Sequence, residues 1–172
     1  SFAARIAAST DASLPACLLA ALATLSGPRH GGACDRVEAL LEEASRLKRP
    51  TQVIELRLRR GDAIPGFGHP LYPHGDPRAT ALLDAASTLV ARRPKARARL
   101  QPLLELARAM ASHGLPPTVD YGLVALCGAL GAKRGVAALV FAVGRSAGWV
   151  AHVLEQRRSP AVLRPRARYT PL

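Results

Sequence analysis

Residues able to do chemistry are most concentrated in the stretch GFGHPLYPHGDPRA, residues 66–79. Glycines and prolines flank His69 and restrict the backbone around it, as a positioned catalytic group requires. Asp76 followed by proline is typical of a helix start, which places Arg78 in the first turn, either as a surface residue or facing another anion. A metal pair of His69 and His74 would lack a third ligand at any usual spacing. Residues 66–79 are therefore expected to form either part of an active site or a surface loop.

Four further residues have types and surroundings that suit a site, and each also has a plainer structural explanation. His30 precedes two glycines and a helix, where backbone amides can approach an anion, or it lies in an ordinary turn. Asp120 lies at a helix start among apolar neighbours, as a cap or as a carboxylate base. Arg145 interrupts an apolar helix face and needs a partner. Arg164, in RPRARY, belongs to a loose basic tail or to a carboxylate clamp.

The elements that carry these residues are expected to be helices. The chain is 49% hydrophobic but only 4% aromatic, so its core must consist mainly of Ala, Leu and Val, and Ala and Leu favour helices. Apolar residues recur at helical spacing, and proline and glycine mark the breaks. We predict an all-α fold without a convincing strand, with helical segments at residues 1–25, 33–47, 50–60, 76–93, 94–112, 119–131 and 135–158.

Charge and cysteine content narrow the class of partner. The net charge of +12 would suit a polyanion, but the basic residues are scattered and aromatic stacking platforms are missing, so we expect no nucleic-acid partner. Cys17, Cys34 and Cys127 form no CxxC pair, which indicates neither zinc nor a redox dithiol and favours a reducing compartment, most simply the cytoplasm. The apolar run at residues 135–144 is too short for a membrane span, so we expect no membrane partner.

Five motifs, taken in order, resemble those of the citrate synthase family. They read SFAARIAAST with SGPRHGGA, then PGFGHPLYPHGDPRA, VDYGLV, FAVGRSAGWVAHVLEQ and RPRARY, and they extend along the whole chain. The resemblance implies an all-α fold of two domains and a homodimer, with the active site at the domain cleft and a C-terminal arginine contributed across the dimer. It assigns residues 1–31 and 143–172 to the large domain and residues 32–142 to a small, CoA-binding domain that closes over the substrate.

The resemblance also implies a role for each candidate residue. Asp120 matches the base that removes a methyl proton from acetyl-CoA. His30 matches the residue that stabilises the enol at the thioester oxygen, and His69 the one that hydrogen-bonds and protonates the oxaloacetate carbonyl. The arginines that hold the oxaloacetate and citrate carboxylates match Arg78, Arg145 and Arg164. The CoA-binding loop matches the backbone of Ile64, Pro65, Gly66, Phe67 and Gly68.

These residue types suit the condensation of acetyl-CoA with oxaloacetate and water to citrate and CoA. A thioester α-proton is weakly acidic, so its removal needs both a base and a hydrogen-bond donor at the forming oxyanion. A dianionic acceptor needs several fixed guanidinium groups. The CoA thioester is itself a substrate, so we expect no separate cofactor.

Two features of the sequence leave the exact activity open. Pro70 stands where an arginine often follows the loop histidine of the family, so 2-methylcitrate synthase, citryl-CoA lyase and a non-catalytic CoA- or carboxylate-binding paralogue remain alternatives. The family's substrate-binding histidine, expected just upstream of Ser1, is absent. We therefore expect this chain to be the C-terminal portion of a longer protein and to show negligible turnover on its own.

Overall fold

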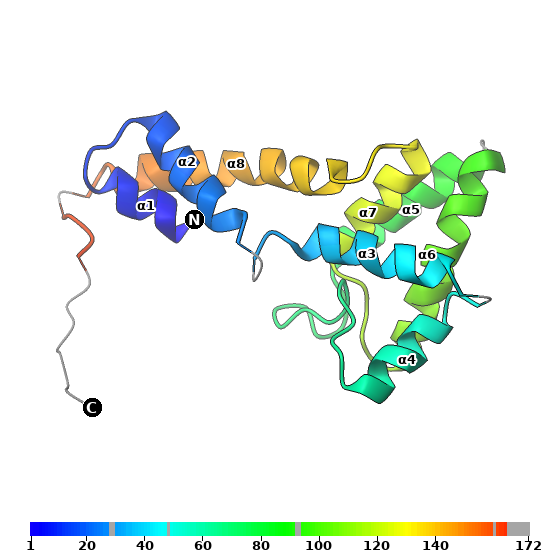
Figure 1. Ribbon diagram of the computed structural model, residues 1–172. Coiled ribbons are helices and arrows are strands. Elements are labelled where there is room, and N and C mark those ends of the chain that lie inside the picture. Colours follow the sequence, from blue (N-terminus) through cyan, green and yellow to red (C-terminus); the bar gives the residue numbers. More distant parts are fainter. Residues whose placement is uncertain (28–29, 48, 92–93, 160, 165–172) are drawn as a thin grey trace, which may run out of the picture. The chain divides into compact units, whose positions relative to one another are not determined.

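The fold consists of helices joined by short turns and one long loop (Figure 1). The computed structural model describes residues 1–27, 30–47, 49–91, 94–159 and 161–164 of the 172-residue chain. Within these residues it contains eight helices and no strand, which confirms the predicted all-α class. The helices are α1 (Phe2–Ala8), α2 (Leu14–Leu25), α3 (Ala33–Ser45), α4 (Gln52–Arg60), α5 (Pro77–Ala91), α6 (Pro94–Ser112), α7 (Val119–Leu130) and α8 (Val136–Gln156).

The apolar start of the chain forms two helices rather than one continuous helical segment. The hydroxyls of Ser9 and Thr10 each donate to a backbone carbonyl three residues earlier, at 2.8 Å, and so end α1. Asp11 adopts a positive φ of 57°, and the Ser13 hydroxyl accepts from a backbone N–H of α2 at 3.4 Å. Short polar side chains compete with helical backbone bonds, and this explains the break.

The chain divides into two compact units, each with its own packing. Unit 1 comprises residues 1–30 and 142–172, and unit 2 comprises residues 31–141. The division therefore falls inside α8. These limits lie one residue from the domain boundaries expected from the sequence. The assignment of the two parts to a large and a small domain stays a prediction.

Unit 1 joins the two ends of the chain through polar contacts between α1 and the last turns of α8. Arg5 lies 3.2 Å from His152 Nδ1, donates to Gln156 Oε1 at 3.4 Å and forms an ion pair with Glu155. Small buried residues let the helices approach closely. The buried side chains of unit 1 include Ala4, Ala8, Cys17, Ala21, Trp149 and Val153.

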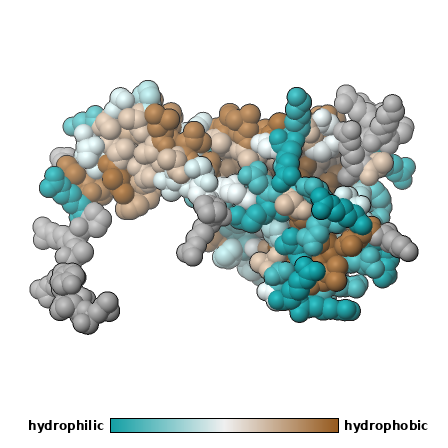
Figure 2. All heavy atoms as spheres, viewed as in Figure 1, coloured by the Kyte–Doolittle hydropathy of each residue, from teal (hydrophilic) through white to brown (hydrophobic). Residues whose placement is uncertain are grey.

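Unit 1 also carries exposed apolar surface (Figure 2). Leu19, Val143 and Leu154 are 65%, 63% and 52% exposed.

Among the described residues, α8 is long and apolar enough to cross a membrane by length and composition. This corrects the expectation that no apolar segment reaches that length. A helix that packs against other polypeptide has the same composition, and exposed apolar patches often mark such faces.

Helix α7 lies at the centre of unit 2, in contact with α3, α5 and α6. The Tyr121 side chain is fully buried, and its hydroxyl donates to the Leu103 carbonyl of α6 at 2.7 Å. Gly122 lets α5 come close, because a Cβ at this position would lie 3.1 Å from the Ala79 Cα. These two contacts hold the first turn of α7, which carries Asp120, against two neighbouring helices.

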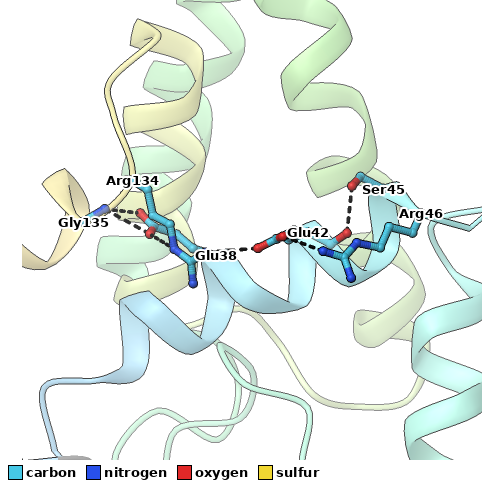
Figure 3. A network of polar contacts seen from close by, with 6 residues as sticks. All are labelled: Glu38, Glu42, Ser45, Arg46, Arg134 and Gly135. Atoms are coloured by element: carbon cyan, nitrogen blue, oxygen red, sulfur yellow. Dashed lines mark hydrogen bonds and ion pairs between the residues drawn. The ribbon is translucent and has the colours of Figure 1, made fainter.

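A charged network ties α3 to the beginning of α8 within unit 2 (Figure 3). The Glu38 carboxylate accepts from the Gly135 N–H with both oxygens, at 3.1 and 3.0 Å, and lies 3.6 Å from the Arg134 guanidinium. Arg134 also pairs with Glu42, which in turn pairs with Arg46. The N–H groups at the start of a helix have no acceptor within the helix, and Glu38 supplies an acceptor to the N–H of Gly135, directly before α8. The negative charge of Glu38 also interacts favourably with the positive end of the α8 dipole.

Candidate active site

Asp76 joins the long loop to two helices of unit 2. The residue is 2% exposed, and its carboxylate accepts from the Arg78 backbone N–H at 3.0 Å, as the predicted N-cap should. It also accepts from Arg78 Nε at 2.9 Å and Nη2 at 2.8 Å, and from the Val119 N–H at 3.0 Å. The hydrogen bonds from Arg78 hold the pKa of Asp76 below its usual range, although burial opposes them. Asp76 thus links the start of α5 to the start of α7.

Arg78 is held in a fixed direction by Asp76 and by an aromatic ring. Its guanidinium lies 5.0 Å from the centroid of the Tyr72 ring, and its side chain is 47% exposed. The hydrogen bond to Asp76, and then the charges of Asp76, Tyr72 and Asp120, raise the pKa of Arg78. Among the described residues, no protein group takes a hydrogen bond from Nη1. That amino group can therefore meet an anionic ligand while Nε and Nη2 stay on Asp76.

Residues 64–68, the predicted CoA-binding loop, are fastened to the segment that leads into α7. Gly66 and Gly68 have positive φ values of 87° and 70°. The Gly66 carbonyl accepts from the Thr118 N–H at 2.9 Å, and the Gly68 N–H donates to the Pro116 carbonyl at 2.9 Å. Two loop segments that are distant in sequence therefore form one backbone framework, and Asp120 follows directly on it.

Gly66 is expected to tolerate no side chain. A Cβ there would lie 2.6 Å from Val37 Cγ2 and 2.9 Å from Tyr121 Cδ2, both inside the core. Gly61 provides a matched control, because it has a similar positive φ of 73° but a Cβ there would meet nothing within 4 Å. We expect Gly66→Ala to lower the free energy of unfolding by about 2 kcal/mol more than Gly61→Ala. Urea denaturation of both variants measures the difference, and equal losses would contradict the tight packing.

A hydrogen bond within its own loop orients the His69 ring and favours one tautomer of the neutral imidazole. Its Nδ1 accepts from the Leu71 N–H at 3.1 Å, so the neutral ring carries its proton on Nε2. The ring is half-buried and packs at 5.1 Å from Tyr72, between centroids. His69 can thus offer an Nε2 donor to a carbonyl, as its expected role requires. His74 is exposed, and no cluster of metal-binding side chains occurs among the described residues.

Asp120 lies in the first turn of α7 and is partly buried. The thiol of Cys34, on α3, donates to its Oδ1 at 3.4 Å. Arg78 is close enough that the Asp120 charge contributes to its raised pKa, after the larger effect of Asp76. A partly buried carboxylate next to the backbone framework of the 64–68 loop can take a proton from a bound substrate.

A cavity of about 310 Å³ opens beside the 64–68 loop, between α3 and α4. Arg57 on its wall pairs with Glu43 at 2.6 Å and donates to the Ala63 carbonyl at 3.2 Å. Arg57 and Arg36 make the lining partly polar, and alanine, proline and glycine residues form the rest of it. Its lining comprises Ala33, Arg36, Ala39, Arg57, Ala63, Pro65 and Gly66.

The remaining candidates lie in unit 1. His30 is exposed, and its backbone N–H donates to the Gly27 carbonyl at 2.9 Å. Arg145 is exposed on α8 and donates to the Ser1 hydroxyl. Arg164 is exposed in the C-terminal segment. The structure thus groups Asp120, Arg78, His69 and the 64–68 loop within unit 2 and leaves these three residues with unit 1.

Two residues of this region were not identified as candidates from the sequence. The spacing of Cys34 argued only against a metal or redox role, and its contact with Asp120 joins positions 86 residues apart. Tyr72 lies between His69 and Arg78 and contacts both side chains. The sequence does contain a signal for Tyr72, because it is an aromatic residue between a histidine and an arginine of the same loop. No local signal pairs Cys34 with Asp120.

Comparison with known proteins confirms the resemblance stated from the motifs. A family model described as citrate synthase, C-terminal domain, matches residues 1–166. The chain is 33% identical over 169 residues to citrate synthase 2 of Bacillus subtilis (strain 168), with 98% of this chain and 45% of the relative covered. It is 36% identical over 170 residues to putative citrate synthase 2 of Mycobacterium bovis, with 98% and 46% covered. The chain therefore spans less than half the length of these curated relatives.

The fold agrees with the same family. The chain resembles the citrate synthase of the archaeon Thermoplasma acidophilum, which was solved with carboxymethyl coenzyme A and oxaloacetate. The two superpose with a TM-score of 0.81 at 29% sequence identity, and the match covers 99% of this chain and 47% of that chain. Both the sequence motifs and the helical arrangement therefore lead to one assignment. The chain belongs to the citrate synthase family and corresponds to its C-terminal domain.

Proposed function

We propose that the full-length protein containing this chain is an acyltransferase that condenses acetyl-CoA with oxaloacetate and water to give citrate and CoA. The observation that carries the proposal is the position of Asp120 at the start of α7, directly after the backbone bonds that join residues 116–118 to the 64–68 loop. This arrangement suits a base beside a thioester that is held by loop backbone. Membership of the citrate synthase family supports the same reaction.

In the proposed mechanism, Asp120 removes a proton from the acetyl methyl group. His30 donates a hydrogen bond to the thioester oxygen, where negative charge develops as the enol forms. The enol carbon then attacks the ketone carbon of oxaloacetate, and His69 transfers its Nε2 proton to the resulting alkoxide. Water hydrolyses the citryl thioester, which releases citrate and the CoA thiol.

The acceptor carboxylates are proposed to be held by Arg78, Arg145 and Arg164. Arg78 can use its Nη1 group, because Asp76 occupies Nε and Nη2. We propose that Arg164 acts across a homodimer and that residues 32–142 form the small, CoA-binding domain. Its closure over the substrates would exclude water until the carbon–carbon bond has formed. The 310 Å³ cavity beside the 64–68 loop offers room for part of the CoA molecule.

The proposal includes the setting in which the enzyme works. Acetyl-CoA and oxaloacetate are its partners, and it needs neither a metal nor a separate cofactor. We propose a cytoplasmic protein without nucleic-acid or membrane partners. The exposed apolar side chains of unit 1, such as Leu19 and Val143, would then be covered by protein.

A substrate panel tests this function with the full-length protein. Thiol release is measured with acetyl-CoA or propionyl-CoA in the presence of oxaloacetate, and citryl-CoA cleavage is followed separately. We expect oxaloacetate-dependent thiol release to be fastest with acetyl-CoA and the isolated 172-residue chain to give negligible turnover. Faster reaction with propionyl-CoA would identify a 2-methylcitrate synthase, and cleavage alone a citryl-CoA lyase. CoA binding without any turnover would identify a non-catalytic paralogue, and each of these results would overturn the proposal.

A further inference from the structure

Cys34 lies where α3 meets the first turn of α7. It is the second residue of α3 and is 1% exposed. Its Sγ donates to Asp120 Oδ1 at 3.4 Å, within the range for a sulfur donor. Among the described residues, this thiol is the hydrogen-bond donor that the structure places on the Asp120 carboxylate.

The surroundings of this pair leave it little freedom to move. Val37 follows Cys34 by one turn of α3, and Tyr121 follows Asp120 directly. Both lie so close to Gly66 that a Cβ there would be 2.6 Å from Val37 and 2.9 Å from Tyr121. The two helices and the 64–68 loop therefore meet at close contact next to the Cys34–Asp120 hydrogen bond, and this fixes the distance between sulfur and carboxylate.

We propose that Cys34 is a positioning residue for proton abstraction, which holds Asp120 Oδ1 so that Oδ2 faces the substrate methyl group. The proposal rests on the proposed function, in which Asp120 is the base. Cys34 itself touches neither substrate nor reacting atoms in this role. Its contribution is to select one rotation of the carboxylate before substrate binds, which is a form of preorganisation.

The chemistry of the thiol suits this task. Burial, and then the adjacent Asp120 charge, raise the pKa of the Cys34 thiol, so it keeps its proton and remains a donor at neutral pH. A hydrogen bond to a carboxylate stabilises the charged form and makes the group less basic. A thiol is a weak donor, so it can orient Asp120 at little cost in proton affinity. A hydroxyl or amide at the same place would orient the carboxylate but weaken the base more.

The test uses the pH dependence of kcat/KM in the full-length protein, whose acid limb reports the pKa of the essential base. We expect Cys34→Ala to lower kcat by about tenfold, since the carboxylate loses its orienting hydrogen bond. Its acid limb should move up by about half a pH unit, because the charged carboxylate has lost a donor. Cys34→Ser keeps a donor on the same Cβ, so its acid limb should return to the wild-type position or below, and most of kcat should return with it.

Cys127→Ala is the matched control, because Cys127 is also buried in unit 2 but its thiol pKa is raised chiefly by burial and by Glu38 rather than by Asp120. We expect its acid limb to coincide with the wild type. A wild-type acid limb and kcat in Cys34→Ala would overturn the proposal, and so would a serine variant that matches the alanine variant. Asp120→Asn distinguishes a failure of the base assignment from a failure of the positioning role. If it retains full activity, the base assignment and the positioning role both fail, whereas an inactive Asp120→Asn with an unchanged Cys34→Ala refutes the positioning role alone.

Discussion

Asp120→Asn is expected to lower the rate of oxaloacetate-dependent thiol release by about a thousandfold. Asparagine has nearly the shape of aspartate, but its amide cannot accept the methyl proton of acetyl-CoA. Asp120 lies in the first turn of α7, where loss of its charge should cost only about 0.5 kcal/mol of helix stabilisation. The variant should therefore fold normally and fail in the proton-transfer step.

Two measurements distinguish this loss from a general defect. Exchange of the acetyl-CoA methyl protons with solvent deuterium should disappear in the variant, while the affinity for oxaloacetate stays close to that of the wild type. Glu55→Gln is the matched control, because Glu55 is also a first-turn acid, on α4, and is exposed. It should keep the wild-type rate. An Asp120→Asn variant that still exchanged the methyl protons would show that another group is the base.

The local part of this site could be predicted from the sequence because its determinants are adjacent residues. Asp76 and Pro77 specify a helix start whatever surrounds them, and the structure has α5 begin at Pro77 with Asp76 bonded to the Arg78 N–H. The positive φ angles of Gly66 and Gly68 likewise depend on a local property, because glycine adopts this conformation without steric cost. Family motifs then added the expected roles, which no pattern of hydrophobicity could supply.

The contacts that combine these parts could not be predicted, because they join distant positions. The Val119 N–H reaches the Asp76 carboxylate across 43 residues, and Cys34 reaches Asp120 across 86. Each depends on how α3, α5 and α7 pack, and helical periodicity gives the buried face of a helix but not its neighbour. The end of α1 was missed for another reason, since the polar side chains after Ala8 compete with an otherwise helical composition.

Asp76→Asn is expected to have the largest effect on stability, a loss of about 3 kcal/mol in the free energy of unfolding. The buried carboxylate accepts from the Val119 N–H and from three N–H groups of Arg78. An asparagine keeps one acceptor oxygen but turns an NH₂ group toward other donors, so at least one buried donor loses its partner. Arg78 is half-exposed and can regain water, which keeps the loss below that of a fully buried ion pair.

The pH dependence of this loss follows from the lowered pKa of Asp76, which the Arg78 hydrogen bonds cause. A carboxyl group whose pKa is lower in the folded state contributes its full stabilisation above its unfolded pKa of roughly 4, and this is lost as pH falls through the folded value. Urea denaturation of the full-length protein should therefore show a difference between wild type and Asp76→Asn that is constant at neutral pH and shrinks below about pH 4. Asp84→Asn, an exposed acid on the same helix, should differ little from wild type at any pH. A wild-type-to-Asp76→Asn difference that stayed constant into strong acid would mean that the Asp76 charge does not stabilise the start of α5 and α7.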